Sequence, residues 1–270
     1  MAWVRRELRE LGIPPLKRFG QHFLLSQLTR DELINQADIS AVDTVVEVGP
    51  GLGFLTSALA SRAGHIVAIE KDRTLAKYLE EKFSAQGNVR VIHGDALTIP
   101  IPDNSKIVSS PPYNISSKLV LQILSSQYKL ACLLLQEDFV RRLTATAGSR
   151  DYGRLTVMLQ TSARAQHISR VPKSAFYPEP RVDSAIAKIT PIHRSLAPSD
   201  YGVFEDLVRT LFTQRRRKLR GVLSRYLAVR YAKEKADMFA AIDLCEKRVY
   251  ELHPEDFVKL SNLITDSVKK

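Results

Sequence analysis

The stretch from Ser109 to Ser117 contains the residue types best suited to hold a planar base. It follows a short β-branched run and precedes an amphipathic segment, so we expect a loop between a strand and a helix. Consecutive prolines, Pro111 and Pro112, fix φ and remove two backbone donors, which leaves nearby carbonyl oxygens without local partners. Tyr113 adds an aromatic face beside those acceptors. Taken alone, the same stretch is equally compatible with a proline-rich turn around a packed tyrosine.

Three further stretches contain residues that could bind a ligand, and each follows an apolar run. Gly49, Gly51 and Gly53 permit a tight turn and the close approach of a ligand. Glu70 can accept hydrogen bonds from ribose hydroxyls, and Asp95 can accept one from an adenine amine. The glycine spacing differs from the dinucleotide pattern, and no lysine follows the glycines to bind a phosphate. A cofactor with ribose and adenine but no phosphates fits best, which points to S-adenosylmethionine.

Short apolar runs alternate with amphipathic segments through the first half of the chain, as expected for a parallel sheet wrapped by helices. The runs are 45–48, 66–69, 89–92, 106–108 and 131–135. Right-handed crossovers place the loops after parallel strands along one edge, so the stretches described above are predicted to meet there. Two later apolar runs, 155–159 and 185–189, are predicted to form an antiparallel pair that closes the sheet.

A polar, proline-bounded hinge from Pro191 to Pro198 is the predicted domain boundary. It separates an α/β domain, residues 1–191, from a smaller all-helical domain, residues 192–270, in which strand patterns disappear. Residues 1–20 are basic and contain Pro14-Pro15, so we predict that they form an arm and not a folded element.

The chain is strongly basic. Its 40 lysines and arginines against 29 acids give a formal charge of +11, which favours a polyanionic partner. An amphipathic helix is predicted at 203–212, and a cluster of cations continues it. We predict that these cations bind phosphates of that partner, a kind of contact that positions a protein without reading sequence; a solvated helix face is the alternative. The cluster consists of Arg215, Arg216, Arg217, Lys218 and Arg220.

Neither a membrane segment nor a metal site is expected. No apolar run approaches the ~20 residues that span a bilayer, and the start of the chain lacks an apolar signal core. Cys132 and Cys245 form no CxxC pair and no cluster with histidine, which argues against a zinc site or a disulfide framework. We therefore expect a cytoplasmic protein.

Two more motifs make the chain resemble a known family. They are Gly20-Gln21-His22-Phe23-Leu24 and Phe176-Tyr177-Pro178-Glu179-Pro180-Arg181-Val182-Asp183-Ser184. With the strand-end stretches, they resemble class I methyltransferases and, more narrowly, the ribosomal RNA adenine dimethyltransferases (the KsgA family) over residues 17–260. The resemblance implies a Rossmann-like, mostly parallel sheet with antiparallel closing strands and a small all-helical carboxy-terminal domain.

The resemblance also implies an activity. Members of this family use S-adenosylmethionine to convert adenine amines of small-subunit ribosomal RNA to dimethyladenosine during ribosome maturation. The substrate would be ribosomal RNA in the immature small subunit, and the basic cluster of the helical domain would bind this RNA. We expect a monomer that needs no metal.

The resemblance assigns roles to individual residues. The implied cofactor-binding residues are Gln21, His22, Leu24, Gly49, Gly51, Glu70, Lys71, Asp95, Ala96 and Ser110. Ser110 and Pro111 are also implied in catalysis. Tyr113 would stack on the target base, and Phe176 would offer a second stacking face.

The chain departs from the family in the loop that would hold the base. The family pattern is Asn-Leu/Ile-Pro-Tyr, and Ser110-Pro111 replaces its first two residues. Serine keeps an acceptor oxygen but lacks the amide's donor, which bears on efficiency and on one versus two methyl additions. Two alternatives remain open: a ribosome-assembly or RNA-binding factor with weak or no methylation, and an amino-methyltransferase acting on DNA, where Ser-Pro-Pro-Tyr also occurs.

Overall fold

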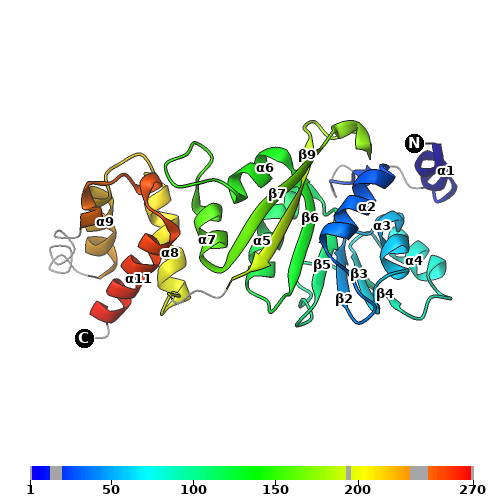
Figure 1. Ribbon diagram of the computed structural model, residues 1–270, viewed down its shortest axis with the longest axis horizontal. Helices are drawn as coiled ribbons and strands as arrows, with labels where there is room; N and C mark the ends of the chain where they lie inside the picture. Colours follow the sequence, from blue (N-terminus) through cyan, green and yellow to red (C-terminus); the bar gives the residue numbers. More distant parts are fainter. Residues whose placement is uncertain (1, 13–19, 193–195, 232–242, 269–270) are drawn as a thin grey trace. The chain divides into compact units, whose positions relative to one another are not determined.

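The computed structural model describes residues 2–12, 20–192, 196–231 and 243–268. Contacts divide the chain into two compact units (Figure 1). The first unit comprises Met1–Val140 and Ala165–Pro191, and the second comprises Arg141–Arg164 and Ile192–Lys270.

The first unit is built around a seven-stranded sheet. Its strands are β2 (Thr44–Val48), β3 (His65–Glu70), β4 (Val89–His93), β5 (Lys106–Ser109), β6 (Leu130–Gln136), β7 (Ala163–Val171) and β9 (Ser184–Pro191). The spatial order is β4-β3-β2-β5-β6-β9-β7. Neighbours from β4 to β6 are parallel, whereas β9 pairs antiparallel with β6. The predicted α/β fold, with a mostly parallel sheet and antiparallel closing strands, is confirmed.

The helices of this unit follow the strands. They are α1 (Ala2–Glu10), α2 (Gln27–Gln36), α3 (Phe54–Ala60), α4 (Arg73–Lys82), the 3-10 turn η2 (Tyr113–Ile115), α5 (Ser116–Leu124), α6 (Glu137–Leu143) and the 3-10 turn η3 (Lys173–Ala175). Helix α4 packs on β3 and β4, and α3 packs on β3. The first six residues of β6 are all buried, as expected for a central strand covered on both faces.

A small second sheet joins two distant motifs. Strand β1 (Phe23–Leu24) pairs antiparallel with β8 (Phe176–Tyr177), so that Phe23 faces Tyr177 and Leu24 faces Phe176 in register. The sequence analysis singled out both segments without pairing them. This ladder places the segment around His22 beside the segment around Pro178.

The second unit has its own hydrophobic core. Its elements are α7 (Arg154–Ser162), α8 (Tyr201–Phe212), α9 (Leu219–Arg230), the 3-10 turns η4 (Asp243–Glu246) and η5 (Val249–Glu251), and α11 (Pro254–Val268). Phe204 and Phe257 are fully buried in this core. The buried Tyr152 hydroxyl donates a hydrogen bond of 2.8 Å to the carbonyl of Leu252, which satisfies a polar group inside the core.

Two secondary-structure predictions were wrong. Residues 1–20 are not simply an arm, because Ala2–Glu10 form helix α1, whose Val4 and Leu8 are buried against Phe23, Leu52 and Leu75; residues 13–19 lie outside the described part. The run at 155–159 belongs to helix α7, and β7 takes its place as the partner of β9.

Two further predictions need correction in the second unit. The basic cluster does not continue a helix, because α8 ends at Phe212 and residues 213–216 form turns before α9 begins at Leu219. The predicted first domain, residues 1–191, also included 141–164, which make their contacts with the helical unit.

Candidate active site

A pocket lies at the carboxyl edge of the parallel strands. All ten predicted cofactor-binding residues line it: Gln21, His22, Leu24, Gly49, Gly51, Glu70, Lys71, Asp95, Ala96 and Ser110. Pro111 and Tyr113 line it as well. The loops after β2, β3, β4 and β5 therefore meet in one cavity, as the predicted topology requires.

The glycine loop after β2 is shaped by close contacts. Gly49 and Gly51 have φ values of 70° and 58°, which glycine adopts without steric cost. A Cβ atom at Gly49 would lie 3.1 Å from Cδ of Pro112, and one at Gly51 would lie 3.0 Å from the Phe23 ring. The absence of side chains at these glycines thus lets the loop pack closely against Pro112 and the Phe23 ring, and it leaves the glycine backbone in the pocket lining.

Glu70 ends β3 with a carboxylate held in place by the backbone. Its Oε2 accepts from the N–H of Gly51 at 3.1 Å, and its Oε1 accepts from the N–H of Asp72 at 2.9 Å. Burial raises the pKa of Glu70 to about 6, because removal from water disfavours the charged form. Each oxygen keeps a lone pair for a hydroxyl donor.

Glu47 is a second buried acid in the pocket wall. Burial, assisted by the charge of Glu70, raises the pKa of Glu47 to about 8, so this carboxyl group is mostly protonated at neutral pH. Its Oε2 has no hydrogen-bond partner among the described residues. The pocket therefore offers one ionised and one neutral acid side by side.

Lys71 and Asp95 form an ion pair at the pocket rim, with 2.7 Å between Nζ and Oδ2. The other Asp95 oxygen accepts from the N–H of Leu97 at 3.0 Å. The hydrogen bond from Lys71 lowers the pKa of Asp95, so the carboxylate stays ionised and can accept from an amine.

The proline loop is anchored by a residue that the sequence analysis did not single out. The buried Ser109 hydroxyl donates to the carbonyl of Val48 at 2.6 Å and accepts from its N–H at 3.3 Å, which ties β5 to β2. Among the described residues, none hydrogen bonds to the Ser110 hydroxyl or to the Pro111 carbonyl. Both acceptors therefore remain available to a ligand.

Tyr113 is fixed at its ring face and at its hydroxyl. The ring stacks on His22 with centroids 5.6 Å apart and planes inclined by 24°. The hydroxyl shares a 2.6 Å hydrogen bond with Oγ of Ser184, and burial raises the pKa of Tyr113 to about 12, so the phenol is neutral. His22 Nδ1 donates in turn to the Pro178 carbonyl at 2.7 Å.

Phe176 does not fill its predicted role. Its side chain is only 1% exposed and belongs to the hydrophobic core with Leu24 and Ile186, so neither ring face is open to a base. Successive side chains of a strand point to opposite faces, which explains why the neighbouring Tyr177 is half-buried instead.

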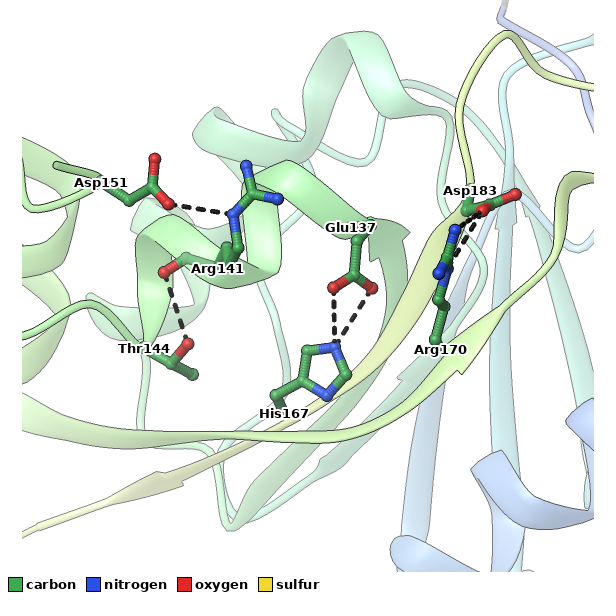
Figure 2. A network of polar contacts seen from close by, with 7 residues as sticks. All are labelled: Glu137, Arg141, Thr144, Asp151, His167, Arg170 and Asp183. Carbon is green, nitrogen blue, oxygen red and sulfur yellow. Dashed lines mark hydrogen bonds and ion pairs between the residues drawn. The ribbon is translucent and has the colours of Figure 1, made fainter.

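The rest of that motif supports Tyr113 indirectly. Asp183 accepts from the Arg170 guanidinium through Oδ2 (Figure 2). Its Oδ1 accepts from the N–H of Lys173. Its carbonyl accepts from the N–H of Glu137, whose carboxylate pairs with His167 at 3.1 Å. These contacts fix Asp183, the residue directly before β9. They therefore help to position Ser184, which hydrogen bonds to the Tyr113 hydroxyl.

Trp3 is a pocket residue that the sequence analysis missed. It comes from α1 and lies 5.6 Å from the Phe54 ring, centroid to centroid. Val4 and Leu8 are four positions apart and would have indicated a helix with one buried face.

In the described part of the chain there is neither a group of side chains that could hold a metal ion nor a helix long and apolar enough to cross a membrane.

The sheet order, the glycine turn after the first parallel strand and the acids at the next two strand ends define the class: this is a Rossmann-like methyltransferase fold. Two solved structures support this classification. The dimethyladenosine transferase from Plasmodium falciparum superposes with a TM-score of 0.78 at 26% identity, covering 91% of this chain and 98% of that one. The 23S rRNA methyltransferase ErmE has a TM-score of 0.69 at 29% identity, covering 92% and 100%.

Sequence comparison identifies the family. The family model of the ribosomal RNA adenine dimethylases matches residues 16–266, so the chain belongs to that family. A probable ribosomal RNA small subunit methyltransferase A from Pyrococcus abyssi is 37% identical over 96% of this chain and 95% of its own length. The protein of that name from Methanosarcina mazei is 38% identical over 92% of each chain. The predicted family, the enzyme class and adenine dimethylation of ribosomal RNA are confirmed.

Proposed function

We propose that this methyltransferase uses S-adenosylmethionine to dimethylate adenine amines of small-subunit ribosomal RNA during ribosome maturation. The observation that carries the proposal is the meeting of Glu70, Asp95 and the Ser110–Tyr113 loop in a single pocket. The residues proposed to bind the ribose, the adenine and the target base thus follow β3, β4 and β5 at one edge of the sheet.

The pocket suits the cofactor. Glu70 offers an acceptor on each carboxylate oxygen for the ribose hydroxyls, and the ionised Asp95 can accept from the adenine amine. Gly49 and Gly51 line the same pocket, and glycine lets a ligand such as the methionine part of the cofactor approach the backbone closely. When bound, S-adenosylmethionine supplies an electrophilic methyl group on a sulfonium.

The proline loop suits the target base. The amine nitrogen of adenine is a poor nucleophile because its lone pair is delocalised into the ring. The Ser110 oxygen and the Pro111 carbonyl can accept its two N–H groups, which favours a pyramidal nitrogen whose lone pair points at the methyl group. Most of the acceleration then comes from orientation and placed dipoles.

No strong base is required at this site. The methylated nitrogen is cationic and readily loses its proton, and the neutral Tyr113 phenol takes no part in that transfer. The base must leave its stack, which costs a few kcal/mol unless it lies in a loop. Stacking on an aromatic ring such as Tyr113 offsets this by about 1–3 kcal/mol.

The decisive experiment is single-turnover methylation of immature small ribosomal subunits, with the nucleosides resolved by mass. We expect dimethyladenosine from the native chain, a sharp loss in Tyr113→Ala with cofactor binding retained, and roughly a 10²-fold loss in Ser110→Ala, as at other placed-dipole sites. Ser110→Asn restores the common family residue and should stay active, with a changed ratio of mono- to dimethyladenosine.

The same experiment tests the alternatives. A native chain without activity, together with a gain in Ser110→Asn, would favour a ribosome-assembly factor that has lost catalysis. Methylcytosine formed in duplex DNA instead of methyladenosine in RNA would favour the DNA enzyme. Full activity in Tyr113→Ala would show that the active site does not lie at this loop.

A further inference from the structure

Helix α1 lies against the candidate cofactor pocket, and its Trp3 lines the cavity. The Trp3 ring packs on Phe54, with centroids 5.6 Å apart and planes inclined by 38°. The side chain is half-buried, and no described residue accepts a hydrogen bond from its indole N–H. Trp3 therefore has a flat apolar surface and one unused donor to offer to a ligand in the pocket.

The buried face of α1 packs on residues that also line the pocket. Val4 and Leu8 of this helix are buried against Phe23, Leu52 and Leu75. Those three side chains belong to the pocket lining, whereas Val4 and Leu8 do not. The same side chains therefore face both α1 and the cavity that the cofactor would occupy.

Two further contacts join α1 to elements that carry pocket residues. Glu7 accepts a hydrogen bond of 2.9 Å from the Tyr78 hydroxyl of α4. Burial and the Glu7 carboxylate raise the pKa of Tyr78 to about 12, so the phenol keeps the proton that it donates. The Arg5 guanidinium lies 4.9 Å from the centroid of the Tyr177 ring in β8, and Tyr177 pairs in register with Phe23 of β1. Helix α1 is thus connected to α4 and, through β8, to the β1 segment.

The glycine loop is held by the same group of side chains. Lys82 of α4 donates through Nζ to the carbonyl of Leu52 at 2.8 Å, and this Nζ lies 5.4 Å from the centroid of the Tyr78 ring. Burial lowers the pKa of Lys82, whereas the Glu7 carboxylate favours its charged form. A displacement of α1 would therefore act on Lys82 and Leu52, and through them on the loop that lines the pocket.

The cluster that α1 forms is separate from the main core of this unit. Its buried members differ from those of the core to which Val45 and Val108 belong. Loss of α1 packing would therefore alter the pocket wall without removing a side chain from the core of the sheet.

From these contacts we infer that Trp3 contacts the bound cofactor, and that α1 packing and cofactor binding stabilise each other. The inference rests on the proposed function, which places S-adenosylmethionine in this pocket. Coupling of this kind is reciprocal: a helix whose packing strengthens cofactor binding is itself held more firmly once the cofactor is bound. Residues of α1 that do not line the pocket then control cofactor affinity. A helix that merely covers the outside of the pocket would leave the affinity unchanged.

Substitutions in α1 separate these two possibilities. Leu8→Asp puts a charge into the buried cluster without changing a pocket-lining residue, and Trp3→Ala removes the proposed contact itself. Leu28→Asp is the matched control, because Leu28 is exposed on α2 and lies outside the pocket lining. In calorimetry, Leu8→Asp and Trp3→Ala should each bind S-adenosylmethionine about tenfold more weakly than the native chain. Leu28→Asp should bind it with native affinity.

Two further measurements follow α1 directly. Trp3 is the single tryptophan of the chain, so emission excited at the red edge of the indole absorption reports on this helix alone. Leu8→Asp should shift that emission towards the spectrum of a solvent-exposed indole, which verifies that α1 has undocked. Amide hydrogen exchange of residues 4–10 in the native chain should slow by about tenfold on saturation with S-adenosylmethionine, because reciprocity makes this factor equal to the loss of affinity.

Native affinity in either Leu8→Asp or Trp3→Ala would overturn the inference, and so would exchange in α1 that the cofactor does not slow. Trp3 is half-buried, so Trp3→Ala keeps the comparison decisive if Leu8→Asp does not fold. None of these measurements needs RNA or turnover. Equal binding by the native chain and both variants would refute this inference alone, whereas a native chain that binds no S-adenosylmethionine would refute the proposed cofactor as well.

Discussion

The hydroxyl of Tyr113 lies 2.6 Å from Oγ of Ser184, although 71 residues separate them in the chain. Ser184 begins β9, the antiparallel strand that pairs with β6, and its side chain is fully buried. The strand β9 therefore holds the Tyr113 ring in position through its hydroxyl. The His22 ring stacks on one face of the Tyr113 ring. The base that we propose to stack on Tyr113 would therefore have to use the ring face that His22 does not cover.

This pair should show measurable coupling in stability. Tyr113→Phe and Ser184→Ala each leave a buried hydroxyl without its partner, which costs about 1–3 kcal/mol. The double variant should cost less than the sum of the two, with an interaction energy of about 0.5–3 kcal/mol. Urea unfolding of the four proteins provides the measurement. Strict additivity would show that the hydrogen bond contributes nothing to the fold.

Asp95 should be essential for cofactor affinity. Asp95→Ala removes the proposed adenine acceptor, so calorimetry should show S-adenosylmethionine binding at least about tenfold more weakly, a loss of about 1.4 kcal/mol. Glu246→Ala is the matched control, because this carboxylate also pairs with a lysine but lies outside the pocket. Similar affinities of the native chain and Asp95→Ala for S-adenosylmethionine would show that Asp95 does not bind the cofactor.

Cofactor affinity should depend on pH through Glu70. Its pKa is raised to about 6, whereas Glu47 with a pKa of about 8 stays mostly protonated and Asp95 with a lowered pKa stays ionised between pH 5 and 7. Ribose hydroxyls donate best to the ionised carboxylate, so the affinity should fall as pH drops below about 6 and level off above it. Glu70→Gln should bind more weakly and without this pH dependence. Calorimetry from pH 5 to 7.5 distinguishes the two profiles.

Phe176 should contribute to stability and not to base stacking. Because its ring is buried in the core, Phe176→Ala should lower the free energy of unfolding by about 3–5 kcal/mol. Leu28→Ala provides a control, since Leu28 is 85% exposed and should change it by less than about 0.5 kcal/mol. Denaturant unfolding measures both. A stable Phe176→Ala protein that no longer methylates would restore the stacking role.

Local sequence patterns were sufficient to predict the parallel strands of the sheet. The runs that became β2, β3, β5 and β6 consist almost wholly of apolar or β-branched residues, and strands buried on both faces have that composition. The run at 155–159 has the same composition but lies in α7. A short apolar run does not distinguish a strand from a buried helix, and here packing against α8 and α11 decides.

The lining of the pocket was predictable for a related reason. Topology alone brings loops after parallel strands together, so Gly49, Glu70 and Asp95 could be assigned to one pocket without coordinates. The supports of Tyr113 were not predictable, because Ser184 and His22 reach it through the pairing of β9 with β6 and of β1 with β8. The pairing of β1 with β8 depends on a register that hydrophobic pattern specifies weakly in two-residue strands. The same register decides that Phe176 faces inwards.

Helix α1 has a practical consequence for anyone preparing this protein. Trp3 forms part of the pocket wall, and Glu7 accepts a hydrogen bond of 2.9 Å from the Tyr78 hydroxyl. Trimming of the first ten residues as an apparent tail would remove Trp3 from the pocket wall and break the Glu7–Tyr78 hydrogen bond. Binding measured on such a shortened protein would therefore describe an altered pocket.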